Sequence, residues 1–226
     1  QGVVVSESSH GVLTDNYVGF HPHTSALRTL PRFTRAMYND AGYDGEIVSL
    51  GVHRAYNIRH GAGPLPTHSE SMSESLLPGS NKLENRWQGK VRVGPLDLVL
   101  LRYALAASGE GAYDGLAITW FDQVAQNGEW DICDSYAYTP GRSDWYETPV
   151  LESIAKDCGL GGNVNQIAHL LQSTRKVHAN CTSIPLPSGA DRDQLYDLVA
   201  KKLLDHLGVP VRMISFGPTE QDKVCK

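Results

Sequence analysis

An aspartate ends the most hydrophobic strand that the sequence predicts. Residues 114–122 read DGLAITWFD, a buried strand that closes on Asp122 beside Trp120 and Phe121. Open α/β sheets bind ligands outside the carboxyl ends of their strands. A carboxylate at that place can accept two hydrogen bonds at a fixed spacing, as the N1–H and exocyclic amine of guanine require. The alternative, a helix cap or a surface turn, needs no ligand.

A second strand end offers a wall for the same pocket. The apolar run 209–219 is expected to be the last strand, and it ends in Ser215, Phe216, Gly217 and Pro218. Its backbone groups and the phenyl face could line the pocket that Asp122 marks.

The loop GFHPHTS carries two histidines and two hydroxyl side chains. His21 and His23 flank Pro22, and alternating histidines can ligate a metal, but no third ligand is evident nearby. A structural or hydrogen-bonding role for both histidines is therefore favoured. Thr24 and Ser25 have hydroxyl groups suited to a phosphate or a ribose, although such residues are commonplace in loops.

A basic pair lies just before a predicted helix. Lys90 and Arg92 follow Gly89, and a guanidinium there can clamp a carboxylate or a phosphate with two hydrogen bonds. A solvated basic turn is the alternative, and the pair taken without its context favours that alternative.

The elements that must position these residues alternate along the chain. Strands alternating with helices indicate an α/β fold with a largely parallel sheet flanked by helices. The long irregular stretches 7–31 and 62–94 are expected to be functional loops. We expect strands at 2–6, 45–61, 114–122, 130–139 and 209–219, and helices at 32–44, 95–108, 146–160, 162–176 and 191–208.

Bulk properties exclude several classes of protein. The chain has 226 residues, 41% hydrophobic content and a net charge of −5, so it lacks the basic footprint of a nucleic-acid-binding protein. No apolar run approaches the ~20 residues of a membrane span. Its four cysteines lack metal-site spacing and indicate reduced thiols in the cytoplasm: Cys133, Cys158, Cys181 and Cys225.

Taken together, these segments resemble the carboxyl-terminal half of the adenylosuccinate synthetase family. The resemblance runs through the whole chain in order, in the stretches QG, HPHTS, AYNIRHGAGPLPT, GKVRVGPLDLVLLRYAL, LAITWFD and VPVRMISFGP. RHGAGPLPT is the most specific of them. The resemblance implies that residues 1–226 form the carboxyl-terminal portion of a single domain whose amino-terminal half is missing.

The resemblance also implies a ligation reaction. A nucleoside triphosphate phosphorylates the 6-oxygen of a purine monophosphate, and the amino group of L-aspartate then displaces the phosphate. The monophosphate is IMP, or dGMP in the phage branch of 2-aminoadenylosuccinate synthetases, and Mg²⁺ with GTP or ATP is implied. Phosphorylation is needed because a carbonyl oxygen is a very poor leaving group, and catalysis rests on positioning and charge neutralisation.

The resemblance assigns a ligand to each of ten positions. The purine monophosphate would be bound by Gln1, Thr24, His60 and Lys90, the aspartate by Lys90 and Arg92, and the base of the triphosphate by Trp120, Asp122, Ser215, Gly217 and Pro218.

Two departures from the family pattern bear on activity. Trp120 stands where the family has a lysine that stacks over guanine, and an indole stacks on any purine, so GTP and ATP both stay open. The phosphate loop, the magnesium ligand and the catalytic residues of the family would all precede Gln1. We therefore expect no catalytic residue or metal ligand in this chain, which would be inactive alone and would act as a homo-oligomer or with an amino-terminal fragment. The alternative is a non-catalytic nucleotide-binding module.

Overall fold

The computed structural model describes residues 2–77, 84, 86–138, 150–152, 154 and 177–226. Its main sheet has the strand order β1-β5-β9-β10, in which the first three strands are parallel and the last is antiparallel to its neighbour. These strands are β1 (Leu50–Arg54), β5 (Gly115–Thr119), β9 (Val211–Ser215) and β10 (Lys223–Cys225). The predicted α/β class with a largely parallel sheet is confirmed by this sheet.

A second sheet is built around one long strand. β6 (Glu129–Tyr138) pairs in parallel with β4 (Leu96–Asp97) on one side and antiparallel with β8 (Val177–Pro185) on the other. The short strand β7 (Val150–Leu151) also pairs antiparallel with β6. The predicted antiparallel strand at 130–139 is therefore confirmed, whereas β8 was not predicted.

A short ribbon connects the two sheets along the chain. β2 (Asn57–Arg59) pairs antiparallel with β3 (Arg92–Gly94), and their register places Arg59 opposite Arg92. Between these strands the chain forms α2 (Glu70–Leu76), whose amino end is capped by the Ser69 hydroxyl. The stretch 62–94 was expected to be irregular throughout, and α2 and β3 correct that expectation.

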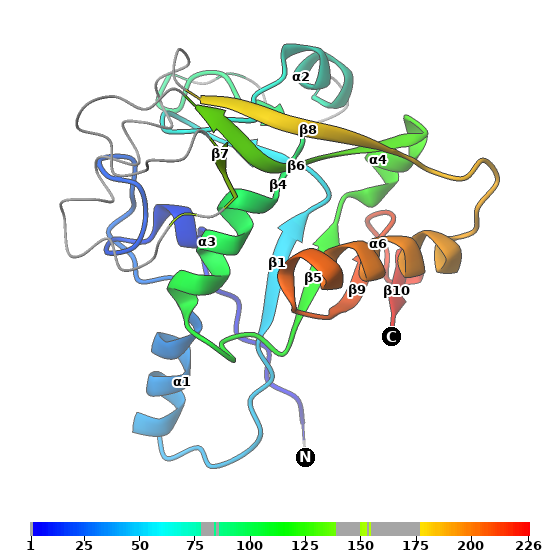
Figure 1. The fold of residues 1–226 in the computed structure, drawn as a ribbon. Coiled ribbons are helices and arrows are strands. Elements are labelled where there is room, and N and C mark those ends of the chain that lie inside the picture. Colours follow the sequence, from blue (N-terminus) through cyan, green and yellow to red (C-terminus); the bar gives the residue numbers. More distant parts are fainter. Residues whose placement is uncertain (1, 78–83, 85, 139–149, 153, 155–176) are drawn as a thin grey trace.

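The core lies between the sheets and two long helices. α3 (Leu98–Ser108) and α6 (Arg192–Leu207) bury apolar side chains against β5, β6 and β9. Figure 1 shows α6 lying across the main sheet and α3 beside β6 and β7, with α1 (Pro31–Asp40) standing apart below them. α6 begins at a capping box between Asp191 and Gln194 and ends at Gly208, as its sequence predicts.

Two of the expected strands differ in the structure. Residues 2–6 were expected to form a buried strand, but Val3 and Val5 are 93% and 86% exposed, because no described strand pairs with them. The strand expected at 114–122 ends at Thr119, and Asp122 lies in the first turn of α4 (Phe121–Gln126). Within the helix expected at 146–160, Val150 and Leu151 form β7 instead, and residues 146–149, 153 and 155–160 lie outside the described residues, as does the whole helix expected at 162–176.

Candidate functional site

Two arginines close a glycine turn at the end of the β2–β3 ribbon. Arg92 donates from Nη2 to the carbonyl oxygens of Gly61 and Gly63, both at 2.8 Å. Arg59 donates from Nε to the carbonyl oxygen of Ala62 at 2.9 Å. Gly63 has a φ of +117°, and a Cβ there would lie 2.2 Å from Nη2 of Arg59. The turn therefore requires glycine, and it holds both guanidinium groups in place.

Arg59 and Arg92 bring two positive charges close together without a neighbouring negative charge among the described residues. Burial, reinforced by the nearby charge of Arg92, lowers the pKa of Arg59 to about 10. Burial also lowers the pKa of Arg92. Within the described part of the chain, both guanidinium groups donate to backbone carbonyl oxygens, and neither forms an ion pair with a carboxylate. An anionic ligand would supply the missing counter-charge.

The loop with the two histidines docks on this pair. Arg59 donates from Nη2 to the carbonyl oxygen of His23 at 3.1 Å. His21 contacts the carbonyl oxygen of Asn16 through Nε2 at 2.8 Å, so Nε2 carries the proton and Nδ1 accepts from the Thr24 hydroxyl at 3.3 Å. Both ring nitrogens of His21 are thereby occupied, which supports the hydrogen-bonding interpretation of this loop over a metal site.

The structure thus brings three predicted segments together, although two of the predicted side chains in them, Lys90 and His60, are exposed. Thr24 and Arg92 lie in the segments that meet at Arg59. Lys90, by contrast, is exposed and forms an ion pair with Glu70 of α2, and His60 is exposed at the start of the glycine turn. Gln1 lies outside the described residues.

A second group of predicted residues lies where β5 and β9 end. These strands are parallel neighbours with Ile118 opposite Ile214, so the residues that follow them are adjacent. The rings of Phe121 and Phe216 pack edge to face with centroids 5.6 Å apart. Asp122 lies in the first turn of α4, where its negative charge suits the helix amino end. The carboxylate is near the strand end, as predicted, although it belongs to a helix.

Trp120 is held in a left-handed conformation under an arginine that sequence reasoning missed. Its φ of 62° lets the chain turn sharply from β5 into α4. The guanidinium carbon of Arg54, at the end of β1, lies 4.7 Å from the centre of the indole ring, a cation–π contact. Nη1 of Arg54 is buried without a hydrogen-bond partner in the described structure. In the sequence, the feature that could have identified Arg54 as a site residue is its position directly before AYNIRHGAGPLPT.

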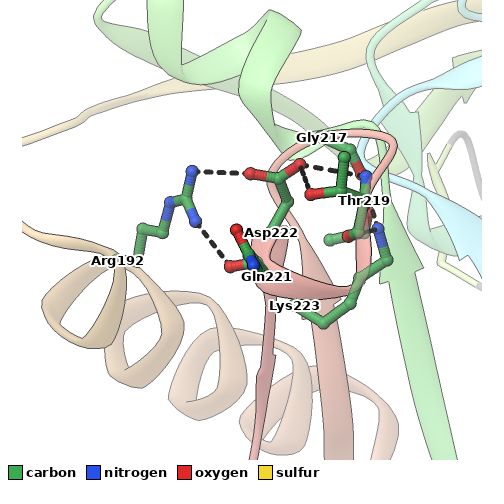
Figure 2. A network of polar contacts seen from close by, with 7 residues as sticks. Arg192, Gly217, Thr219, Gln221, Asp222 and Lys223 are labelled. Atoms are coloured by element: carbon green, nitrogen blue, oxygen red, sulfur yellow. Dashed lines mark hydrogen bonds and ion pairs between the residues drawn. The ribbon is translucent and has the colours of Figure 1, made fainter.

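The turn after β9 is fixed by the polar network in Figure 2. Asp222 accepts hydrogen bonds from the backbone N–H of Thr219 at 3.0 Å and from its hydroxyl at 2.6 Å, and it pairs with Arg192 at 2.9 Å. Lys223 donates from Nζ to the carbonyl oxygen of Gly217 at 2.5 Å and of Thr219 at 2.8 Å. These contacts hold the Gly217–Pro218 segment at the end of β9.

Ser215 and Pro218 complete this second group. The Ser215 hydroxyl donates to the carbonyl oxygen of Gly217 at 2.9 Å, and Pro218 is exposed at the tip of the turn. Tyr56, which lies between β1 and β2, connects this group with the β2–β3 ribbon. Its hydroxyl donates to Gln123 of α4 at 2.9 Å. Of the ten predicted residues, Thr24 and Arg92 therefore belong to the segments around the arginine turn, and Trp120, Asp122, Ser215, Gly217 and Pro218 lie at the ends of β5 and β9.

Other features of the described residues lie outside these two groups. A hollow of about 280 Å³ between α2, α4 and β6 is lined by none of the ten predicted residues. No three metal-binding side chains gather in the part of the chain that the structure describes. No helix there is long and apolar enough to cross a bilayer.

Known proteins match this chain over nearly its whole length. A model of the adenylosuccinate synthetase family matches residues 1–224. An adenylosuccinate synthetase from Aquifex aeolicus is 27% identical over 227 residues, which cover 99% of this chain and 49% of that protein. Adenylosuccinate synthetase 1 from Methanosarcina acetivorans is 25% identical over 99% of this chain and 50% of its own length.

The fold matches as well. The fully ligated adenylosuccinate synthetase from Plasmodium falciparum superposes with a TM-score of 0.69 at 17% identity, covering 97% of this chain and 49% of that one. The chain therefore spans about half the length of the relatives that it matches.

Proposed function

Because this chain belongs to the adenylosuccinate synthetase family, we propose that it supplies the substrate-binding half of a purine nucleotide ligase. The reaction joins L-aspartate to the 6-position of a purine monophosphate, IMP or dGMP, with hydrolysis of a nucleoside triphosphate. Phosphorylation of the 6-oxygen creates the leaving group, and the aspartate amino group displaces it.

The arginine pair carries this proposal. Arg59 and Arg92 stand opposite each other in the ribbon, partly or fully buried, with no carboxylate to balance them among the described residues. A guanidinium can bind a carboxylate or phosphate with two parallel hydrogen bonds, which a dicarboxylate or a nucleotide would satisfy. Neutralising charge on the transferring phosphoryl group is also the main task of such a catalyst. Thr24 follows His23, whose carbonyl oxygen accepts from Arg59, and we propose that its hydroxyl binds the monophosphate.

The second group supports a site for the base of the triphosphate. Asp122 provides two acceptor oxygens, and the turn at Gly217 and Pro218, which follows the neighbouring strand β9, provides backbone groups. Trp120 provides an aromatic surface, and Arg54 lies against one face of it. The carboxylate favours guanine, whose N1–H and exocyclic amine are both donors, so we propose GTP as the triphosphate and ATP as the competing one.

The phosphate-transferring machinery is proposed to come from a polypeptide that matches the other half of the relatives. We propose that Mg²⁺ is bound there as well. β1 is an edge strand of the main sheet in the described structure, and its Val52 is 72% exposed. An apolar strand edge of this kind is a ready docking surface for another strand.

Turnover with and without that polypeptide tests the proposal. The chain is assayed alone and co-purified with the amino-terminal half of a family member, with L-aspartate and Mg²⁺, IMP or dGMP, and GTP or ATP. Ligated product, identified by its mass, is expected only with the complementing half. Monophosphate binding without product in every combination would favour the alternative, a non-catalytic nucleotide-binding module, and would refute the ligase.

A further inference from the structure

Two cysteines that are far apart in the sequence face each other across the second sheet. Cys133 of β6 and Cys181 of β8 are direct partners in the antiparallel register. Opposed residues in such a pair hold their Cα atoms about 4.5–5.5 Å apart, within the range of about 4.4–6.8 Å that disulfides span. Both residues are free thiols in this structure. The sequence indicated reduced thiols without a short spacing, and the fold brings two of them opposite each other.

The two thiols have different surroundings. Cys133 is fully buried beneath α3, whereas Cys181 is exposed. A hydrogen bond from Cys133 lowers the pKa of Cys181 in spite of partial burial. The same hydrogen bond, together with burial, raises the pKa of Cys133. Cys181 is therefore the more reactive and accessible sulfur, and Cys133 lies behind it in position to react second.

We propose that Cys133 and Cys181 form a reversible thiol–disulfide site whose oxidant is a small disulfide such as oxidised glutathione. The Cys181 thiolate attacks one sulfur of the small disulfide and releases its other half as a thiolate. Cys133 loses its proton to that released thiolate or to solvent and attacks the Cys181 sulfur of the mixed disulfide. A second small thiol leaves. One small disulfide is thereby reduced to two thiols, and one protein disulfide is formed.

The position of the pair explains why the disulfide would be easily reduced and which strands it would link. Opposed Cβ atoms in an antiparallel pair lie about 4.5–5.5 Å apart, more than the mean of about 3.8 Å in disulfides, so the bond would be strained and easily reduced. Cys133 is also the register partner of Asp97 in β4, directly after the strand that carries Arg92. Oxidation would link β8 covalently to β6, the strand that pairs with β4.

Peptide mapping after glutathione oxidation tests this site. The purified protein is equilibrated in oxidised glutathione, free thiols are alkylated, and the peptides are identified by mass. We expect a linked pair of peptides containing Cys133 and Cys181, which excess reduced glutathione converts back to two alkylated thiols. Glutathione left attached to Cys181 with Cys133 alkylated, or Cys181 linked to Cys158 or Cys225, would overturn the proposal.

Two variants separate the pair from general thiol reactivity. Cys225→Ser removes another exposed thiol and should leave the linked peptide unchanged. Cys181→Ser changes an exposed residue, so it should not disturb folding, and it should abolish the link and leave Cys133 resistant to glutathione. Rapid modification of Cys133 in that variant would contradict the assigned order of attack.

Discussion

Replacing Asp97 tests how the basic strand and α3 are held together. Asp97 is completely buried, accepts a hydrogen bond from the Tyr136 hydroxyl at 2.5 Å, and caps α3 by accepting from the backbone N–H of Leu100 at 3.1 Å. Burial raises the pKa of this carboxyl from 3.8 to about 6, against the effect of those hydrogen bonds. The ionised form is therefore disfavoured in the folded protein. Asn in its place keeps an acceptor oxygen and carries no charge.

The magnitude follows from the two pKa values. The folded state holds the proton more tightly than the unfolded state, so this group's contribution to stability is full below pH 3.8 and is lost as the pH rises through about 6. At about 1.4 kcal/mol per pH unit, the loss amounts to about 3 kcal/mol. Roughly half of it falls between pH 5 and pH 7.5, where other carboxylates have finished titrating. Asp97→Asn should lack this dependence.

Urea unfolding of the two proteins across that pH range measures the effect. The free energy of unfolding of Asp97→Asn minus that of the unchanged protein should rise by roughly 1–2 kcal/mol from pH 5 to pH 7.5. Subtracting the two curves removes the contributions of all other titrating groups. A difference that is constant with pH, or that falls, would refute the assignment of a buried, raised-pKa carboxyl to this position.

Three further substitutions test the proposed binding groups. Arg92→Ala should weaken the use of aspartate by about 2–4 kcal/mol of transition-state stabilisation, measured as kcat/KM in the complemented enzyme. The matched control is Arg35→Ala, which removes a half-buried arginine that pairs with Asp114 and should have little effect on kcat/KM. Asp122→Asn should reduce the discrimination between GTP and ATP, and an unchanged ratio of their kcat/KM values would count against a base-reading role. Hydrogen bonds from Thr219, together with Arg192, lower the pKa of Asp222, so its stabilisation is lost as the pH falls. Asp222→Asn should therefore change stability with pH in the direction opposite to Asp97→Asn and raise the KM for triphosphate, which matched pH series and kinetics would check.

Elements with local signals were predictable from the sequence. α6 has an apolar stripe, a capping box and a terminal glycine within one segment, and all of these act through neighbours a few residues away. The strands β5 and β9 were predicted for the same reason, because they are short buried runs, although the predicted ranges extended beyond their ends at Thr119 and Ser215. The conformation of Trp120 lay beyond such signals, since a left-handed non-glycine residue depends on tertiary contacts such as the one with Arg54.

Long-range pairing accounts for what sequence reasoning missed. Arg59 can be identified as a site residue only from the strand register, which places it opposite Arg92, and from its contact with the loop that contains His23. The facing cysteines depend on the antiparallel pairing of β6 with β8, which includes a bulge near Asp134 that no local pattern encodes. Residues 2–6 have the composition of a strand, but composition does not supply the partner that a strand requires.

Transfer of an oxygen atom tests the central claim most directly. The purine monophosphate is labelled with heavy oxygen at its 6-position and incubated with the complemented enzyme, aspartate, triphosphate and Mg²⁺, and the inorganic phosphate is analysed by mass. If the 6-oxygen is phosphorylated and then displaced by aspartate, each molecule of product should be matched by one labelled phosphate. Product formed with unlabelled phosphate, or labelled phosphate released without aspartate entering the product, would contradict the proposed ligation.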